Sequence, residues 1–131
     1  MVEKIFEGET RMSKILIHIT SGTGEPTKTA LAFLVAKTAK EEGHDVTMFL
    51  AGDAVNLIKD ETINSLVGIG TGSLKEHFDF ITKQKIPIYL SGMSSKARGI
   101  SENDLKDKNA QFALPKILVN LTVENDKVLV Y

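Results

Sequence analysis

Cysteine is absent from this 131-residue chain, and so is tryptophan. Without cysteine the chain can form no disulfide, no thiolate metal site and no cysteine nucleophile. It also offers no residue for a persulfide, because that group needs a polarizable thiolate. Disulfide, zinc-thiolate and sulfur-carrier chemistry are therefore excluded for the chain by itself.

A large charge of one sign is also lacking. The chain has 16 Lys and Arg residues against 17 Asp and Glu residues, a formal net charge of −1. A chain with so small a net charge has no overall electrostatic field that would attract a polyanion or an acidic lipid surface. We expect neither nucleic acid nor a membrane among its partners.

Long apolar runs are missing as well. No segment approaches the roughly 18 apolar residues of a membrane helix, and the opening MVEKIFEGETR lacks the apolar core of a signal sequence. We therefore expect a cytoplasmic protein. The length and the 42% hydrophobic composition suit one domain. We place it at residues 13–131, with residues 1–12 as an N-terminal arm that is disordered unless it docks.

Three short apolar runs predict the strands of a parallel sheet. They are Lys14–Thr20, Val46–Leu50 and Ile86–Leu90. The first is rich in β-branched residues and does not alternate with polar ones, as expected of a strand buried on both faces. Between the first two runs, Pro26–Glu42 predicts a helix that begins at the proline and ends before Gly43. This β-α-β order predicts a right-handed crossover between parallel strands.

Two further helical segments are predicted by capping patterns, Ser73 with Glu76 and Ser101 with Asp104. The first pattern opens a helix that ends near Lys85, and the second suits a single turn. Residues 60–72 are rich in glycine and weakly patterned, so we expect a loop with one short extended piece.

The C-terminal stretch is compatible with two structures. Its β-branched residues favour a hairpin of residues 117–123 with residues 127–131. Pro115 at a first-turn position and the spacing of Ile117 and Leu121 favour a helix that leads into a final strand. Periodicity alone does not decide between them.

A candidate ligand site follows from the parallel sheet, because such sheets bind ligands outside the carboxyl ends of their strands. Three predicted loops should meet there: Ser21–Glu25, Gly52–Asp53, which also opens a short helix, and Ser91–Arg98. The candidate ligand-binding residues of these loops are Ser21, Gly22, Thr23, Gly24, Asp53, Ser91, Gly92, Met93, Ser94, Ser95 and Arg98.

The first loop, SGTGEPTKT, has glycines that let backbone N–H groups face a ligand at a helix N-terminus. It departs from the Walker pattern because Thr27 stands before Lys28, where a glycine is needed. It is similar to the flavodoxin phosphate loop, but Pro26 stands where that loop has a phosphate-binding threonine. An anion cradle and a plain turn into a helix both stay open.

Structural roles compete for the other candidates. Ser91, Ser94 and Ser95 could cap a strand end or a turn, Arg98 could form an ion pair, and Asp53 could cap its short helix.

Known catalytic and metal patterns are not met. The segment GMSSK lacks the second glycine of a nucleophile elbow, and His18, His44 and His77 lack metal-ligand spacing. We predict no metal, no cofactor and no catalytic residue, which leans against an enzyme.

One stretch, IPIYLSGMSSKARGISENDL, resembles the DsrE/DsrF-like family, which includes the YchN-like proteins. KILIHITSG, GHDVTMFLAGDAV and DKVLVY extend the resemblance over residues 14–131. It implies a three-layer α/β/α domain with a Rossmann-like, mainly parallel sheet of about five strands, assembled as a homotrimer or homohexamer. It also favours a helix and a strand for the C-terminal stretch.

The resemblance fails at the residue that carries sulfur. Family members active in sulfur relay have a cysteine at the end of the third strand, eight positions before the glycine of an Arg-Gly pair. Counting back from Gly99 reaches Ser91. A serine hydroxyl neither ionises near neutrality nor binds sulfane sulfur. We therefore expect the pocket without the relay reaction.

The functional prediction is a binding module for a small ligand or a protein. Arg98 would offer a fixed positive charge to a small anion or to a sulfur-relay partner protein. Two alternatives stay open: an enzyme or carrier with an anionic or nucleotide-like ligand in the same crevice, and a non-catalytic subunit of a mixed sulfur-relay assembly.

Overall fold

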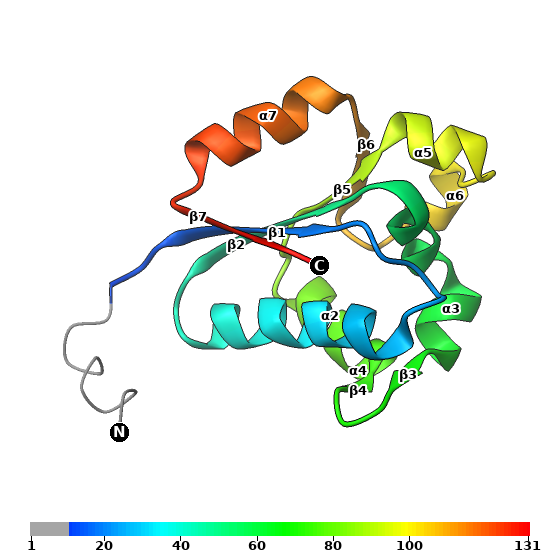
Figure 1. Cartoon of the computed structure of the whole chain (residues 1–131), viewed down its shortest axis with the longest axis horizontal. Helices are drawn as coiled ribbons and strands as arrows, with labels where there is room; N and C mark the ends of the chain where they lie inside the picture. Colours follow the sequence, from blue (N-terminus) through cyan, green and yellow to red (C-terminus); the bar gives the residue numbers. More distant parts are fainter. Residues whose placement is uncertain (1–10) are drawn as a thin grey trace.

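A computed structural model of the chain describes residues 11–131 (Figure 1). The predicted N-terminal arm, residues 1–12, falls outside the described residues except for Arg11 and Met12. Within residues 11–131, no helix is long and apolar enough to cross a membrane.

Five strands form one sheet in the order β6-β5-β2-β1-β7, and every neighbouring pair is parallel. Their bounds are β1 Lys14–Ile19, β2 Asp45–Leu50, β5 Ile88–Ser91, β6 Ala110–Ala113 and β7 Lys127–Val130. The predicted parallel sheet of about five strands is confirmed. The strand β6 had no counterpart among the predicted elements, and β5 begins at Ile88, after Pro87, rather than at Ile86.

Helices cover both faces of the sheet, so the three-layer α/β/α architecture is confirmed (Figure 1). Helices α2 and α4 lie on one face, and α7 lies on the other. The helical segments are α2 Pro26–Glu41, the 3₁₀ helix η2 Gly52–Ile58, α3 Asp60–Ser65, α4 Leu74–Lys83, α5 Gly92–Ala97, α6 Glu102–Leu105 and α7 Pro115–Glu124.

Local signals explain where several of these helices begin. Pro26 opens α2, where its missing N–H costs nothing. The Ser73 hydroxyl accepts a hydrogen bond from the Glu76 N–H at 3.2 Å and so caps α4. A capping box of Ser101 and Asp104 opens α6. All three starts were predicted from the sequence.

Most of the core lies under α2 and α4. Alternate residues of the central strands, such as Ile17 and Leu50, point to this side and pack against α2 and α4. The rings of Phe33 from α2 and Phe78 from α4 stack with their centroids 5.8 Å apart. The opposite residues, such as Leu16 and Phe49, point to the α7 side and form a small second cluster.

At residues 60–72 the predicted short extended piece is present as a strand, but the prediction of a loop around it is wrong. The segment contains α3 and a small antiparallel hairpin of β3 Val67–Gly68 with β4 Gly72–Ser73. The hairpin is attached to α2, since the Thr27 hydroxyl accepts from the Ile69 N–H at 3.0 Å. Gly68 packs so tightly that a Cβ there would collide with the Thr71 hydroxyl. Tertiary contacts stabilise these short elements, so no local sequence pattern predicts them.

The predicted loop Ser91–Arg98 is also wrong in its conformation, because Gly92–Ala97 forms α5. The C-terminal stretch is the helix α7 followed by the strand β7, so the hairpin alternative is excluded. Strand β7 pairs in parallel with β1 instead of folding back on residues 117–123.

Candidate functional site

The carboxyl ends of β1, β2 and β5 lie at one edge of the sheet, as expected. Ile19 stands beside Leu50 in the register of β1 and β2, and Leu50 stands beside Leu90 of β5. The three segments that follow these strands therefore start side by side, although they are far apart in the sequence.

Close packing joins the first segment to the second. A Cβ on Gly22 would lie 2.6 Å from the Asp53 backbone oxygen and 2.8 Å from the Asp53 Cβ. No side chain fits in that space, so the position requires glycine. Ser21 beside it is buried, whereas Thr23 and Gly24 are exposed.

A hydrogen bond joins the second segment to the third. The Gly52 N–H donates to the Ser94 hydroxyl oxygen at 2.9 Å. Gly52 has a φ of 58°, in the left-handed region that glycine adopts without strain. This turn brings η2 against α5 and carries Asp53 to its place.

Arg98 and Asp53 form the electrostatic centre of this edge. The Arg98 Nε and Nη2 both donate to the Asp53 Oδ1, at 3.1 and 3.0 Å, and Nη1 donates to the Ser94 carbonyl at 3.2 Å. The Asp53 side chain is 72% exposed, so this pair contributes about 0–1 kcal/mol to stability. Asp53 does not cap η2, whose N-cap is Ala51.

Ser91 lies at the junction of β5 and α5. It is the last residue of the strand and the N-cap of the helix, and its hydroxyl oxygen accepts from the Ser94 N–H at 3.1 Å. The hydroxyl hydrogen is left to donate to another group. Gly92 follows with room for a side chain, since a Cβ there would lie 3.6 Å from the nearest atom, the Ala113 carbonyl oxygen.

The other two candidates of the third segment point in different directions. Met93 is largely exposed, and Ser95 is buried, with its hydroxyl lacking a hydrogen-bond partner among the described residues. The structure thus brings Gly22, Asp53, Ser91, Ser94 and Arg98 together. Thr23 instead lines a separate groove of about 320 Å³.

A row of rings leads away from Ser91 on the α7 side of the sheet. His18, Phe49 and Tyr89 occupy neighbouring positions in the register of β1, β2 and β5. The His18 and Phe49 rings meet edge to face with centroids 5.9 Å apart, and the Phe49 and Tyr89 rings stack at 6.5 Å. Burial lowers the pKa of His18, because desolvation disfavours the imidazolium.

This row of rings was not predicted from the sequence. Each ring belongs to a different strand, and only the register of the sheet aligns them. The available signal was the alternation within each predicted strand, which puts Tyr89 on the same side as Ser91.

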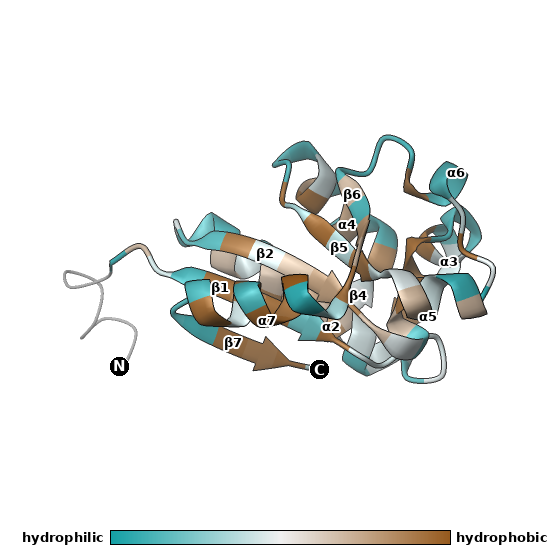
Figure 2. Ribbon diagram, turned by 90° about the horizontal axis from the view of Figure 1, so that it is seen from above, coloured by the Kyte–Doolittle hydropathy of each residue, from teal (hydrophilic) through white to brown (hydrophobic). Residues whose placement is uncertain are grey.

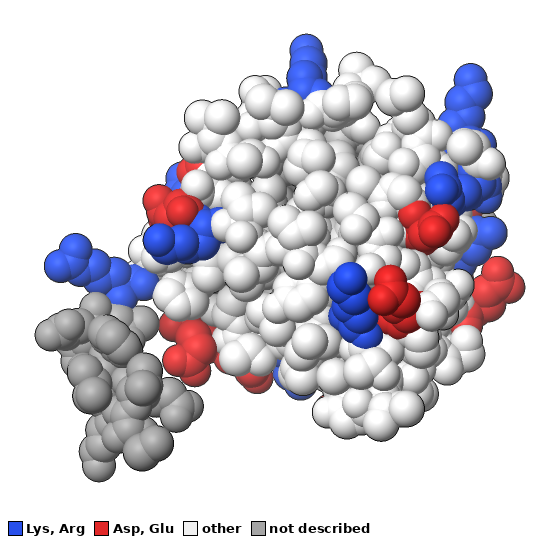
Figure 3. Space-filling model, in the orientation of Figure 1, with Lys and Arg blue, Asp and Glu red and all other residues white. Residues whose placement is uncertain are grey.

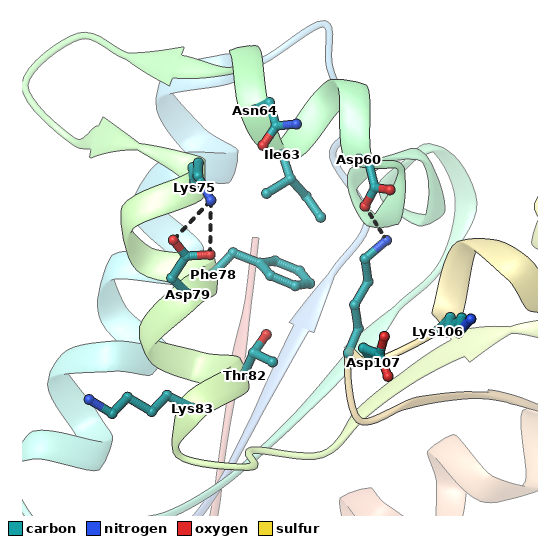
Figure 4. A pocket seen from close by; sticks show the side chains of 11 residues that line it. Asp60, Ile63, Asn64, Lys75, Phe78, Asp79, Thr82, Lys83, Lys106 and Asp107 are labelled. Atoms are coloured by element: carbon teal, nitrogen blue, oxygen red, sulfur yellow. Dashed lines mark hydrogen bonds and ion pairs between the residues drawn. The ribbon is translucent and has the colours of Figure 1, made fainter.

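A groove of about 540 Å³ lies elsewhere, between α3, α4 and the segment before β6 (Figure 4). The Phe78 ring points into it, and ion pairs flank it: Lys75 with Asp79 at 3.0 Å, and Lys108 with Asp60 at 2.7 Å. None of the eleven predicted site residues lines this groove.

Metal ligands do not gather in the part of the chain that the structure describes. Residues 11–131 hold no group of three or more His, Cys, Asp or Glu side chains that could bind an ion. The three histidines serve separate elements. For example, the His77 ring nitrogen Nε2 lies 2.7 Å from the Thr71 carbonyl oxygen, and the His44 Nδ1 accepts from the Ser13 N–H at 3.1 Å.

Comparisons with known proteins agree with this architecture. The model of the DsrE/DsrF-like family matches residues 13–131. The crystal structure of the YchN protein from E. coli is similar, with a TM-score of 0.75 and 24% identity over 92% of this chain and 100% of that chain. A conserved protein of unknown function from Bacteroides thetaiotaomicron has a TM-score of 0.62 and 15% identity over 93% of this chain and 100% of that chain. No curated protein matches the chain in sequence. At these identities the two structures share its fold.

Proposed function

Since the chain belongs to the DsrE/DsrF-like family, we propose that it is a binding module of that family which carries no sulfur. It would recognise a small anion or a protein partner at the carboxyl edge of its sheet. The anion is the form of this proposal that the geometry supports most directly.

The state of Ser91 is the observation that carries the proposal. This residue stands where the resemblance expects the sulfur-carrying cysteine, and its hydroxyl is engaged in capping α5. A hydroxyl cannot take up sulfane sulfur. What the position retains is its place at the end of β5, where Ser94 connects it to Arg98 of the ion pair.

The ion pair suggests how an anion would bind. Asp53 occupies two of the guanidinium donors from an exposed position. An incoming anion would replace this carboxylate on Arg98, and the exchange is inexpensive because an exposed pair is worth about 0–1 kcal/mol. Arg98 stays held during the exchange by its hydrogen bond to the Ser94 carbonyl.

Titration with inorganic sulfate, followed by amide NMR shifts, tests anion binding. We expect shifts in residues 21–24 and 91–98. Asp53→Asn should tighten binding about two- to fivefold by removing the competing carboxylate, and Arg98→Gln should abolish it. Asp79→Asn, which breaks the exposed pair with Lys75, is the matched control and should change nothing. Shifts confined to other regions, or an unchanged affinity in Arg98→Gln, would refute the anion site.

The absence of a sulfur carrier has its own test. Incubation with a persulfide donor should leave the intact mass unchanged, whereas Ser91→Cys should present a reactive thiol at the end of β5. A stoichiometric sulfur adduct on the native chain would contradict the proposal. An inert thiol in the folded Ser91→Cys variant would show that the strand end is closed to ligands.

Self-association into a homotrimer or homohexamer is a separate part of the proposal. Its support is the set of exposed apolar side chains on α7 and β7; Figure 2 colours β7 largely as hydrophobic. Sedimentation equilibrium at micromolar concentrations should give a multimer, and a monomer throughout that range would refute it.

A further inference from the structure

Exposed apolar side chains gather at the C-terminal end of the chain. Of the eleven large apolar side chains exposed in residues 11–131, six lie between Leu114 and Val130. Three of these, Val128, Leu129 and Val130, are consecutive in β7. A soluble domain seldom leaves such a run uncovered without a use for it.

Among the residues that the structure describes, strand β7 is also an open edge of the sheet. It pairs with β1 on one side and ends the strand order on the other. The Tyr131 N–H donates to the His18 carbonyl at 2.9 Å, and the Tyr131 carbonyl accepts from the Thr20 N–H at 2.8 Å. Backbone groups alternate in direction along a strand. The N–H and C=O groups of Leu129 therefore also point to β1, and those of Val128 and Val130 point to the open side.

The usual protection of an edge strand is weak here. Natural edges carry inward charges, prolines or bulky covers that block pairing with another chain. In β7, Lys127 is the one charged residue, and there is no proline. Figure 3, in the orientation that puts β7 foremost, shows charged side chains mainly around the margins of a broad uncharged face.

We propose that β7 pairs antiparallel with β7 of a second copy, about a two-fold axis at Leu129. The pairing would join two five-stranded sheets into one continuous sheet. Val128 of each copy would exchange backbone hydrogen bonds with Val130 of the other, and the two Leu129 residues would face each other as a non-hydrogen-bonded pair. The inference rests on the homohexamer form of the self-association proposed above, in which this two-fold contact would join two trimers; a homotrimer by itself would contain no such contact.

A second copy fits this edge because the strand is complementary to itself. In this register the β-branched side chains of Val128 and Val130 meet across the strands on the α7 side, a favourable pairing. Each Lys127 lies opposite Tyr131 of the other copy. The two Lys127 residues stay roughly 14 Å apart along the strands, which is beyond the screening length of about 10 Å at 0.1 M salt. The two-fold contact closes on itself and does not propagate into a fibre.

Cysteine cross-linking tests the register cleanly, because the chain has no cysteine of its own. In a non-hydrogen-bonded pair the two Cα atoms of Leu129 would lie about 4.5 Å apart, within disulfide range. Leu129→Cys should therefore give a covalent dimer under mild oxidation. Val130→Cys is the matched control, since its two Cα atoms would lie roughly 8 Å apart, beyond disulfide reach, and it should give less than about a tenth of that yield.

A second variant tests the contact without a cross-link. Val130→Pro removes an outward N–H and leaves the bonds to β1 in place, so the fold should persist by circular dichroism while the two-fold contact is lost. In sedimentation a hexamer should then become a trimer.

The outcomes separate the two proposals. A multimer that gives no disulfide in Leu129→Cys, or equal yields from both cysteine variants, would overturn this register and leave self-association standing through another surface. A native monomer would overturn both, and would favour an extended segment of a different protein as the partner of this edge.

Discussion

The two faces of the sheet are built from the same strands, but helices cover them to different degrees. On one face, α2 alone buries five residues, and α4 adds four. On the other face α7 buries none, although Ile117, Leu118 and Leu121 pack against the small cluster around Phe49. The first face is closed within the chain. The second is half covered, and its remaining apolar surface is available to another molecule.

The open face also holds what is distinctive about the candidate site. Ser91 and the rings of His18 and Tyr89 lie on the α7 side, and His18 stands beside Val130 of the uncovered strand β7.

The largest effect should come from truncating matched leucines on the two faces. Leu74 of α4 is fully buried, whereas Leu121 of α7 is partly exposed. Leu74→Ala should lower the free energy of unfolding by about 2–5 kcal/mol, and Leu121→Ala by about 1 kcal/mol, because less of its surface is buried. Urea unfolding measures both. Equal losses would mean that the two faces are equally closed.

Lys108 provides a polar test of the same closed region. Its ammonium donates to the Ile58 and Asp104 carbonyls at 2.8 and 2.7 Å and pairs with Asp60, so all three N–H donors are used, and the side chain is 11% exposed. Lys108→Met leaves these acceptors without the donor that Lys108 supplies. It should lower the free energy of unfolding by about 1–3 kcal/mol.

Lys75 is the control for that prediction. Its pair with Asp79 is exposed at the surface, so Lys75→Met should cost less than about 0.5 kcal/mol. If both lysine variants lose the same amount in urea unfolding, the three bonds of Lys108 add nothing beyond a surface contact.

Two glycines of one loop sharpen the contrast at the site edge. Gly22 is pressed against Asp53, whereas Gly24 has no atom within 4 Å of an added Cβ. Gly22→Ala should cost about 1–2 kcal/mol and displace Asp53 from Arg98, while Gly24→Ala should change stability by less than about 0.5 kcal/mol. Thermal unfolding and the amide shifts of Asp53 report both. A silent Gly22→Ala would mean that the first two segments are not in contact.

The smallest effect concerns pH and the open face. Burial lowers the pKa of His18 below its unfolded value, so at acid pH the unfolded chain takes up this proton before the folded one does. Stability that is complete above the unfolded pKa, about 6.5, is therefore lost as pH falls through it towards the folded pKa. In urea unfolding at pH 5 and 7.5, native protein should lose more than His18→Leu. Identical losses in the two proteins would show that His18 stays equally solvated in both states.

The elements that carry their own local signals were predicted from the sequence. Pro26, Ser73 and Ser101 mark helix starts by their local chemistry, and the β1 run contains no polar alternation because both of its faces are covered. Strand β6 was not predicted, because its sequence AQFA has no strand pattern and it is ordered by pairing with β5. Helix α3 was not predicted either, since six residues are too few to form a stable helix without tertiary contacts.

The candidate site was predicted as three loops that meet at one edge of the sheet. In the structure the three segments do meet there. Because the segments of Asp53 and Arg98 were expected to meet, their proximity was predicted although they are 45 residues apart. The hydrogen bonds between them were not predicted, because no local pattern fixes side-chain geometry across such a distance. The third segment is also a helix, which follows from the capping of Ser94 by Ser91 and from packing against η2.

The sequence by itself determined what chemistry this protein lacks and which residues of each strand and helix are apolar. The missing chemistry follows from composition, because a chain without cysteine has no thiolate. The apolar side of each strand follows from periodicity, because successive residues of a strand point to opposite sides. Only the tertiary structure decided which of those apolar sides is covered. Coverage depends on the strand order and on the path of α7 across β1, which leaves β7 bare beside it. These are set by contacts between distant segments, and no local pattern encodes them.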